Sequence, residues 1–137
     1  MHIEPGVLAA GKLMAANAVA LAVVGAAALT LLRQPRLLLR TLLAATFFSA
    51  CMQAFHMPVG PSELHFIGAM PIYLALGLAP TLLGFALGLA VQGWLFEPAD
   101  LPHLSVNTLS LALPLLAVHA TLGRRLQRVN LRAVLQL

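Results

Sequence analysis

The chain has 137 residues, of which 61% are apolar and only 9% are charged. A soluble domain carries about 25% charged residues, so this composition excludes a water-soluble globular protein and indicates an integral membrane protein. The formal net charge of +4 does not indicate nucleic-acid binding, because seven of the eight basic residues gather at two places, between the first two apolar segments and after the last one.

Five apolar segments predict five membrane helices, since a span needs about 20 apolar residues. They run from about Lys12 to Leu32, Leu37 to Met57, His65 to Leu78, Pro80 to Phe96 and Leu104 to Leu122. The third and fourth are short and meet at 78–81, so we expect either a tight helical hairpin or a partly re-entrant pair. Backbone polar groups in lipid must be satisfied internally, which favours helices throughout. The predicted fold is one all-α membrane bundle over residues 1–137.

Arginines set the predicted orientation, because cytoplasmic loops carry the excess of Lys and Arg. One group lies between the first two segments and the other follows the fifth: Arg33, Arg36, Arg40, and Arg124, Arg125, Arg128, Arg132. With both groups inside, alternation places the N-terminus outside and the basic C-terminal tail inside. All four acidic residues then fall outside: Glu4, Glu63, Glu97 and Asp100.

The stretch 122–137 has apolar residues at spacings of three and four, which predicts an amphipathic helix. It is either a cytoplasmic tail that lies on the membrane or docks a partner, or the lead-in to further spans.

The first six residues, MHIEPG, contain no base, whereas a secretory signal begins with a basic leader. We therefore expect Met1 to keep its free amine. The amine and the amide nitrogen of His2 close a five-membered ring on a metal, and that amide with Nδ1 of His2 closes a six-membered ring. Three nitrogens in one plane suit Ni(II) and Cu(II), with Co(II) a neighbour in affinity. A fourth donor must come from elsewhere, and the alternative is an exposed histidine that binds nothing.

Two histidines bracket the predicted outer loop, on the same side as Met1. His65 opens the third segment and is a candidate metal ligand, because a histidine at membrane depth is a functional candidate. The alternative for His65 and for His56 is an interfacial histidine without a ligand. Ser62, followed by Glu63, is predicted to cap the third helix.

Two further histidines lie in or near the fifth segment. His103 is predicted to be exposed in an outer loop, and His119 to be hydrogen-bonded inside the bundle. Gln92 and Asn107 are expected to face other helices, and Asn107 is a candidate for contact with the ligands of the metal. Cys51 is expected to be a small buried residue.

Several stretches together resemble the CbiM/NikM-type substrate-binding subunits of energy-coupling-factor cobalt and nickel transporters. They are the start Met1-His2-Ile3 with Gly6, the segment Phe55 to His65, the run Leu89 to Phe96, and Asn107. The resemblance implies a membrane protein that binds Co²⁺ or Ni²⁺, as transported substrate, through the amine of Met1, the amide and imidazole of His2, and His65.

The resemblance also implies partners and a location. These are a transmembrane coupling permease, cytoplasmic ATPase subunits, a small accessory membrane subunit and the lipid bilayer of the cell (inner) membrane. Members of the family continue with further spans, so this C-terminally shortened chain is expected to be a short variant, a fragment or a truncated gene product. The loop 59–65 departs from the Gly-Thr-Ser-rich form of the family. His56, Ser62, Glu63 and Asn107 are candidates for the surroundings of the metal.

Two rival functions remain at this point. One is a helical membrane scaffold or assembly subunit without a ligand. The other is a membrane enzyme with a histidine-bound metal, which the missing acid–base residues disfavour. The sequence contains no Ser-His-Asp arrangement, no phosphate-binding glycine loop and no paired intramembrane carboxylates, and we predict that the chain itself is not an enzyme.

Overall fold

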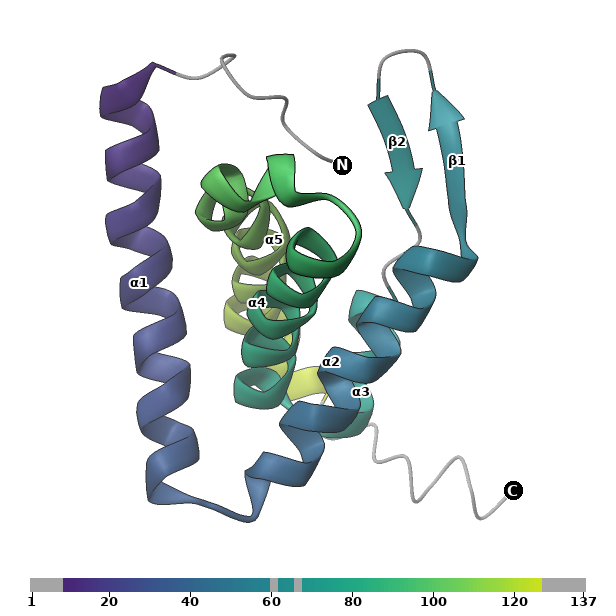
Figure 1. Ribbon diagram of the computed structural model, residues 1–137. Coiled ribbons are helices and arrows are strands. Elements are labelled where there is room, and N and C mark those ends of the chain that lie inside the picture. The colour runs from purple at the N-terminus through teal and green to yellow at the C-terminus, as the bar shows by residue number, and fades with distance from the viewer. Residues whose placement is uncertain (1–8, 60–61, 66–67, 127–137) are drawn as a thin grey trace.

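The structure is a computed structural model that describes residues 9–59, 62–65 and 68–126. In this part of the chain, α-helices form a bundle that carries one short hairpin (Figure 1). The elements in chain order are α1 (Ala10–Arg33), α2 (Leu37–Ala54), β1 (His56–Val59), β2 (Ser62–His65), α3 (Ala69–Leu76), α4 (Leu78–Leu95), the 3-10 helix η1 (Pro98–His103) and α5 (Leu104–Leu126).

The structure confirms a helical membrane protein. Four helical stretches are long and apolar enough to cross a membrane: Ala10–Arg33, Leu37–Ala54, Leu78–Leu95 and Pro98–Leu126. They correspond to the first, second, fourth and fifth predicted segments. The last of them includes η1, because Leu104 has right-handed helical dihedral angles and the helix continues through it.

The third predicted segment differs from its prediction. Only Ala69–Leu76 is helical there, and His65 ends a strand instead of opening a helix. Ser62 is not a helix cap, because it lies in β2 opposite Val59. The cause is local: Gly68 has a φ of 60°, a left-handed conformation that glycine adopts readily and that cannot belong to the helix.

Successive helices alternate in direction (Figure 1). We call the end that carries β1, β2 and η1 the hairpin end, and the end that carries the α1–α2 turn and the end of α5 the arginine end. α1 begins at the hairpin end, α2 returns to it, α3 and α5 run away from it, and α4 runs toward it (Figure 1). The described arginines Arg33, Arg36, Arg40, Arg124 and Arg125 lie in the segments that form the arginine end. The described arginines of both groups therefore share one end, as the sequence predicts.

Helix α4 is the centre of the bundle. In its most apolar 18-residue window 56% of the residues are buried, against 11% in the corresponding window of α1, which stands to one side (Figure 1). The rings of Phe48 on α2 and Phe85 on α4 are fully buried and their centroids are 5.2 Å apart. The tightest packing of the fold is thus between α2 and α4.

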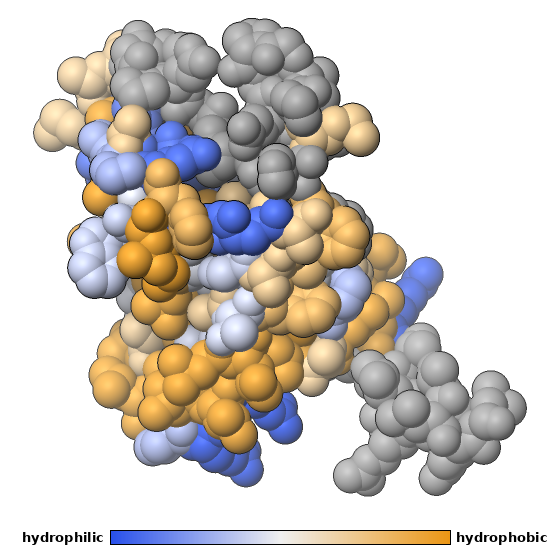
Figure 2. Space-filling model, turned by 45° about the vertical axis from the view of Figure 1, so that its right-hand side comes forward, coloured by the Kyte–Doolittle hydropathy of each residue, from blue (hydrophilic) through white to orange (hydrophobic). Residues whose placement is uncertain are grey.

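Large apolar side chains cover much of the outer surface. Hydrophobic residues spread over the lower part of the space-filling view, while hydrophilic patches gather at the bottom edge and in the upper half (Figure 2). Leu21 and Leu32 of α1 and Trp94 of α4 are each exposed by more than 70%. Such a surface is stable in lipid and not in water, which accords with the membrane assignment.

Candidate metal site

The hairpin pairs the two histidines of the predicted outer loop. β1 and β2 are antiparallel, and their register places His56 directly opposite His65. Both residues lie where the hairpin joins the bundle, since β1 follows α2 after Phe55 and β2 comes just before the segment that leads to α3. Sequence reasoning expected these histidines at opposite ends of one loop, and the strand pairing that brings their backbones together was not predicted.

The first turn of α1 lies at this same end of the bundle (Figure 1). Ala9 is the N-cap of α1 and has extended dihedral angles, so the chain enters α1 from the hairpin end. The predicted ligands Met1 and His2 lie outside the described residues. Among the described residues no group of three or more His, Cys, Asp or Glu side chains is placed to hold a metal ion.

Asn107 and His103 lie buried at the hairpin end. Asn107 is 4% exposed and its Oδ1 has no hydrogen-bond partner in the described part of the chain. The prediction that His103 is exposed was wrong: it is 5% exposed, and its Nδ1 likewise lacks a partner among the described residues. The physical reason is that 98–103 forms η1 instead of a loop, and η1 packs against α4. A signal was available in the spacing, since His103 and Asn107 are four residues apart and share a helix face once the two elements are continuous.

A second group of polar side chains joins α2 to α4 near the same end. Nε2 of Gln53 lies 2.6 Å from Oε1 of Gln92, and Nε2 of Gln92 donates to the backbone oxygen of Ser49 at 3.2 Å. Gln92 therefore faces a neighbouring helix and is hydrogen-bonded there, as the sequence predicts. Because the amide of Gln92 is engaged on both sides, it is a structural contact between helices.

His119 belongs to the other half of the bundle. Its Nδ1 lies 2.7 Å from the hydroxyl of Tyr73, and the two rings meet edge to face. The prediction of a histidine hydrogen-bonded within the bundle is confirmed. This hydrogen bond connects the short helix α3 to α5. Because Nδ1 of His119 has a partner, His119 differs from His103 and Asn107, each of which has a buried polar atom without a partner among the described residues.

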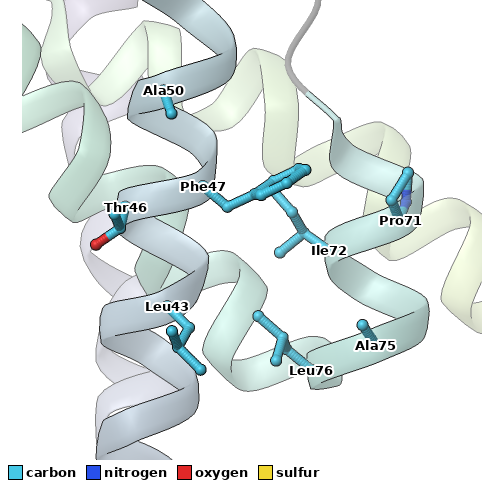
Figure 3. Close-up of a pocket in the computed structure, with 8 residues that line it drawn as sticks. All are labelled: Leu43, Thr46, Phe47, Ala50, Pro71, Ile72, Ala75 and Leu76. Atoms are coloured by element: carbon cyan, nitrogen blue, oxygen red, sulfur yellow. The ribbon is translucent and has the colours of Figure 1, made fainter.

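The cleft between α2 and α3 is lined by described residues that are almost all apolar and include no histidine, cysteine or acidic residue. It has a volume of about 440 Å³ (Figure 3). Its lining consists of Leu43, Thr46, Phe47, Ala50, Pro71, Ile72, Ala75 and Leu76. The hydroxyl of Thr46 already donates to the backbone oxygen of Leu42. Cys51 is buried nearby, with its Sγ close to where a side chain on Gly68 would lie, and it is confirmed as a small buried residue.

Comparison with known proteins gives one family and one curated relative. A family model described as "CbiM: Cobalt uptake substrate-specific transmembrane region" matches residues 2–136. A Haemophilus influenzae protein named "Putative metal transport protein" is 33% identical over 129 residues, which are 93% of this chain and 60% of the relative. The chain thus spans less than two thirds of that relative's length. No solved structure matches the chain.

Proposed function

Because this chain belongs to the CbiM family, the cobalt uptake substrate-specific transmembrane region, we propose that it captures Co²⁺ or Ni²⁺ for an energy-coupling-factor transporter. Membership of a transport family supports a role in metal uptake and not in chemical turnover. The relative from Haemophilus influenzae is itself named as a metal transport protein, which supports the same role in metal uptake.

The proposed ligands are the amine of Met1, the amide nitrogen and Nδ1 of His2, and the imidazole of His65. One observation supports this assignment: the start of α1 and His65 lie at the same end of the bundle. α1 begins at the hairpin end, and His65 is the last residue of β2 at that end. A short N-terminal segment that folds back over this end would bring its three nitrogens to the fourth donor.

This donor set would select among divalent ions. Four nitrogens in one plane suit Ni²⁺ and Cu²⁺, with Co²⁺ next in affinity, whereas Mg²⁺ and Ca²⁺ prefer oxygen ligands in octahedral or larger shells. His56, which pairs with His65 across the hairpin, and Ser62, Glu63 and Asn107 would surround the ligands and fix their orientation.

Transport itself would need partners. A coupling permease and cytoplasmic ATPase subunits would drive release of the metal across the cell membrane, and a small accessory membrane subunit would complete the complex. In this arrangement the hairpin end faces outward, where metal is captured, and the arginine end faces the cytoplasm.

The test is an alanine inserted between Met1 and His2. The insertion keeps both histidines but removes the two fused chelate rings, so Co²⁺ and Ni²⁺ affinity should fall by orders of magnitude in equilibrium dialysis of the purified protein. The matched control is an alanine inserted after Gly6, which lengthens the same segment and leaves the chelate intact.

Acetylation of the N-terminal amine provides a second arm, because it removes one ligand without changing any side chain. Loss of binding on acetylation supports the proposal. A scaffold protein without a ligand predicts that neither treatment changes metal binding, and unchanged affinity in the insertion variant would refute the assignment of the ligands.

A further inference from the structure

An arginine lies inside one of the helices that are long and apolar enough to cross a membrane. Arg40 belongs to α2, the candidate span Leu37–Ala54, and its side chain is exposed. It has no hydrogen bond or ion pair within the described part of the chain, whose acidic residues lie in the segments at the hairpin end. A charge within a membrane span is costly and marks a functional position by default, so a partner for Arg40 is expected.

Arg40 continues one wall of the apolar cleft between α2 and α3. Leu43, Phe47 and Ala50 line this cleft from α2. Arg40 precedes Leu43 by three residues and Arg36 precedes Arg40 by four, which is the spacing of one helix face. Arg36 has right-handed helical dihedral angles, so the face extends to it. Side chains lean toward the N-terminus of their helix, which for α2 is the arginine end, and both arginines are therefore expected to reach the membrane surface beside the cleft.

The cleft suits a single hydrocarbon chain. Its volume of about 440 Å³ lies within the range of small-molecule clefts, about 300–1,000 Å³. The ring of Phe47 extends from α2 toward α3, and none of the lining side chains is charged (Figure 3). A partner helix is about 10–12 Å across and cannot enter a furrow between two helices that already contact each other.

The charge at this end of the cleft suits an anion. All five described arginines lie at the arginine end. α4 also begins there, at Leu78, without a side-chain cap or an acidic residue in its first turn, so the positive end of its dipole adds to the same field. Nη2 of Arg36 lies 3.3 Å from Oε1 of Gln34, a neutral group that does not compensate its charge. Basic clusters beside a membrane attract anionic lipid headgroups.

We propose that the α2–α3 cleft, together with Arg36 and Arg40, binds one anionic phospholipid from the leaflet at the arginine end. An acyl chain lies in the cleft, and the phosphate lies between the two guanidinium groups. Charge-assisted hydrogen bonds from arginine to phosphate are stronger than neutral ones, so the headgroup provides the selectivity and the cleft fixes the position. The site depends on the membrane location of the chain and not on the metal ligands, so it stands or fails independently of the proposed function.

The test measures which phospholipid occupies the cleft. The full chain contains one tryptophan, which Trp94→Phe removes, and Phe47→Trp then places an indole in the cleft. The protein is reconstituted in phosphatidylcholine vesicles, and brominated acyl chains, which quench indole fluorescence, are supplied on either phosphatidylglycerol or phosphatidylcholine. Quenching should reveal a preference for phosphatidylglycerol of roughly tenfold or more, and Arg40→Gln should reduce it about fivefold. Arg124→Gln is the matched control, because it removes the same charge at the same end from α5, which does not line the cleft, and it should keep the preference.

A second arm fills the cleft without changing any charge. Ala75→Leu adds bulk to the lining on α3 and should lower the quenching by phosphatidylglycerol to that by phosphatidylcholine. Ala120→Leu makes the same change at an exposed position of α5 outside the lining, and the preference should remain. An unchanged preference in Ala75→Leu would overturn the placement of the acyl chain.

Three further outcomes would overturn the site. The first is equal quenching by the two lipids in the parent protein. The second is an equal loss in Arg40→Gln and Arg124→Gln, which would identify diffuse attraction to a basic surface. The third is weak quenching by both lipids, which would show that a second copy of the chain covers the cleft. If Phe47→Trp does not fold, Leu43→Trp reports from the same lining, and the lipid preference is measured there.

Discussion

Single side-chain hydrogen bonds hold the short helix α3 in place. α3 spans only Ala69–Leu76, and Tyr73 is its main polar link to the rest of the bundle through Nδ1 of His119. Tyr73 is 5% exposed, so its hydroxyl has no water to replace a lost partner. The sequence could place His119 inside the bundle because its segment is apolar and helical. It could not name Tyr73 as the partner, because the contact joins residues 46 apart.

Tyr73→Phe removes this hydroxyl and keeps the ring. Inter-helical hydrogen bonds in membrane proteins contribute about 1 kcal/mol, and we expect a loss of that size in the free energy of unfolding, measured by denaturant titration in detergent. Thr121→Val is the matched control, because its exposed hydroxyl bonds only to its own helix and its removal should cost little. Equal losses in the two variants would contradict a special role for the Tyr73–His119 pair.

The close approach of the backbones of α2 and α4 depends on small residues at their interface. A Cβ added at Gly84 of α4 would lie 2.6 Å from Cβ of Ala44 on α2, and one added at Gly88 would collide with the ring of Phe48. Phe48 is fully buried and cannot move aside into open space. The separation of α2 and α4 is therefore set by these two glycines.

Gly88→Ala should accordingly destabilise the bundle. Overpacking of a well-packed interior costs typically 1–3 kcal/mol, and about that loss is expected in the same unfolding measurement. Gly25→Ala in α1 provides the comparison, because nothing lies within 4 Å of its added Cβ and alanine favours a helix. A Gly88 variant as stable as the Gly25 variant would show that α2 can shift away from α4 at no cost.

Helices with long apolar runs could be predicted from the sequence, and the hairpin could not. α2 begins at Leu37, as predicted, because an apolar run starts there after Pro35. Residues 56–65 contain apolar and polar residues without a clear period, and hydropathy alone extends the neighbouring spans into them. The strand pairing of His56 with His65 depends on contacts across the fold that hydropathy does not report, and the turn at Gly68 depends on the positive φ of that one glycine.

The candidate site shows the same limit. The sequence predicts Asn107 near the outer end of its helix, and the structure places it in the first turn of α5 with its side chain buried. His103 was predicted to be exposed because Pro98, Pro102 and two acidic residues are typical of a loop. Proline is tolerated in the first turn of a helix, and here the segment forms a 3-10 helix with Pro98 at its start.

The whole molecule is polarised along the bundle axis. The described acidic residues Glu63, Glu97 and Asp100 lie in the segments at the hairpin end, and the described arginines lie at the other. Between the ends, exposed leucines such as Leu21 and Leu39 cover the surface. The excess of arginines at one end predicts an orientation with that end on the cytoplasmic side, and the proposed capture of metal from outside requires that orientation.

Labelling of single cysteines in intact cells tests this orientation. In a Cys51→Ala background, which removes the natural cysteine from its buried place, Ala99→Cys puts a thiol on the exposed surface of η1 and Gln34→Cys puts one in the exposed turn between α1 and α2. A membrane-impermeant maleimide should label the thiol at position 99 in intact cells and the thiol at position 34 only after permeabilisation. Each variant serves as the control for the other, since both thiols lie outside the apolar surface and react equally in detergent. The reverse pattern would place the hairpin end in the cytoplasm, and capture of external metal at that end would then be excluded.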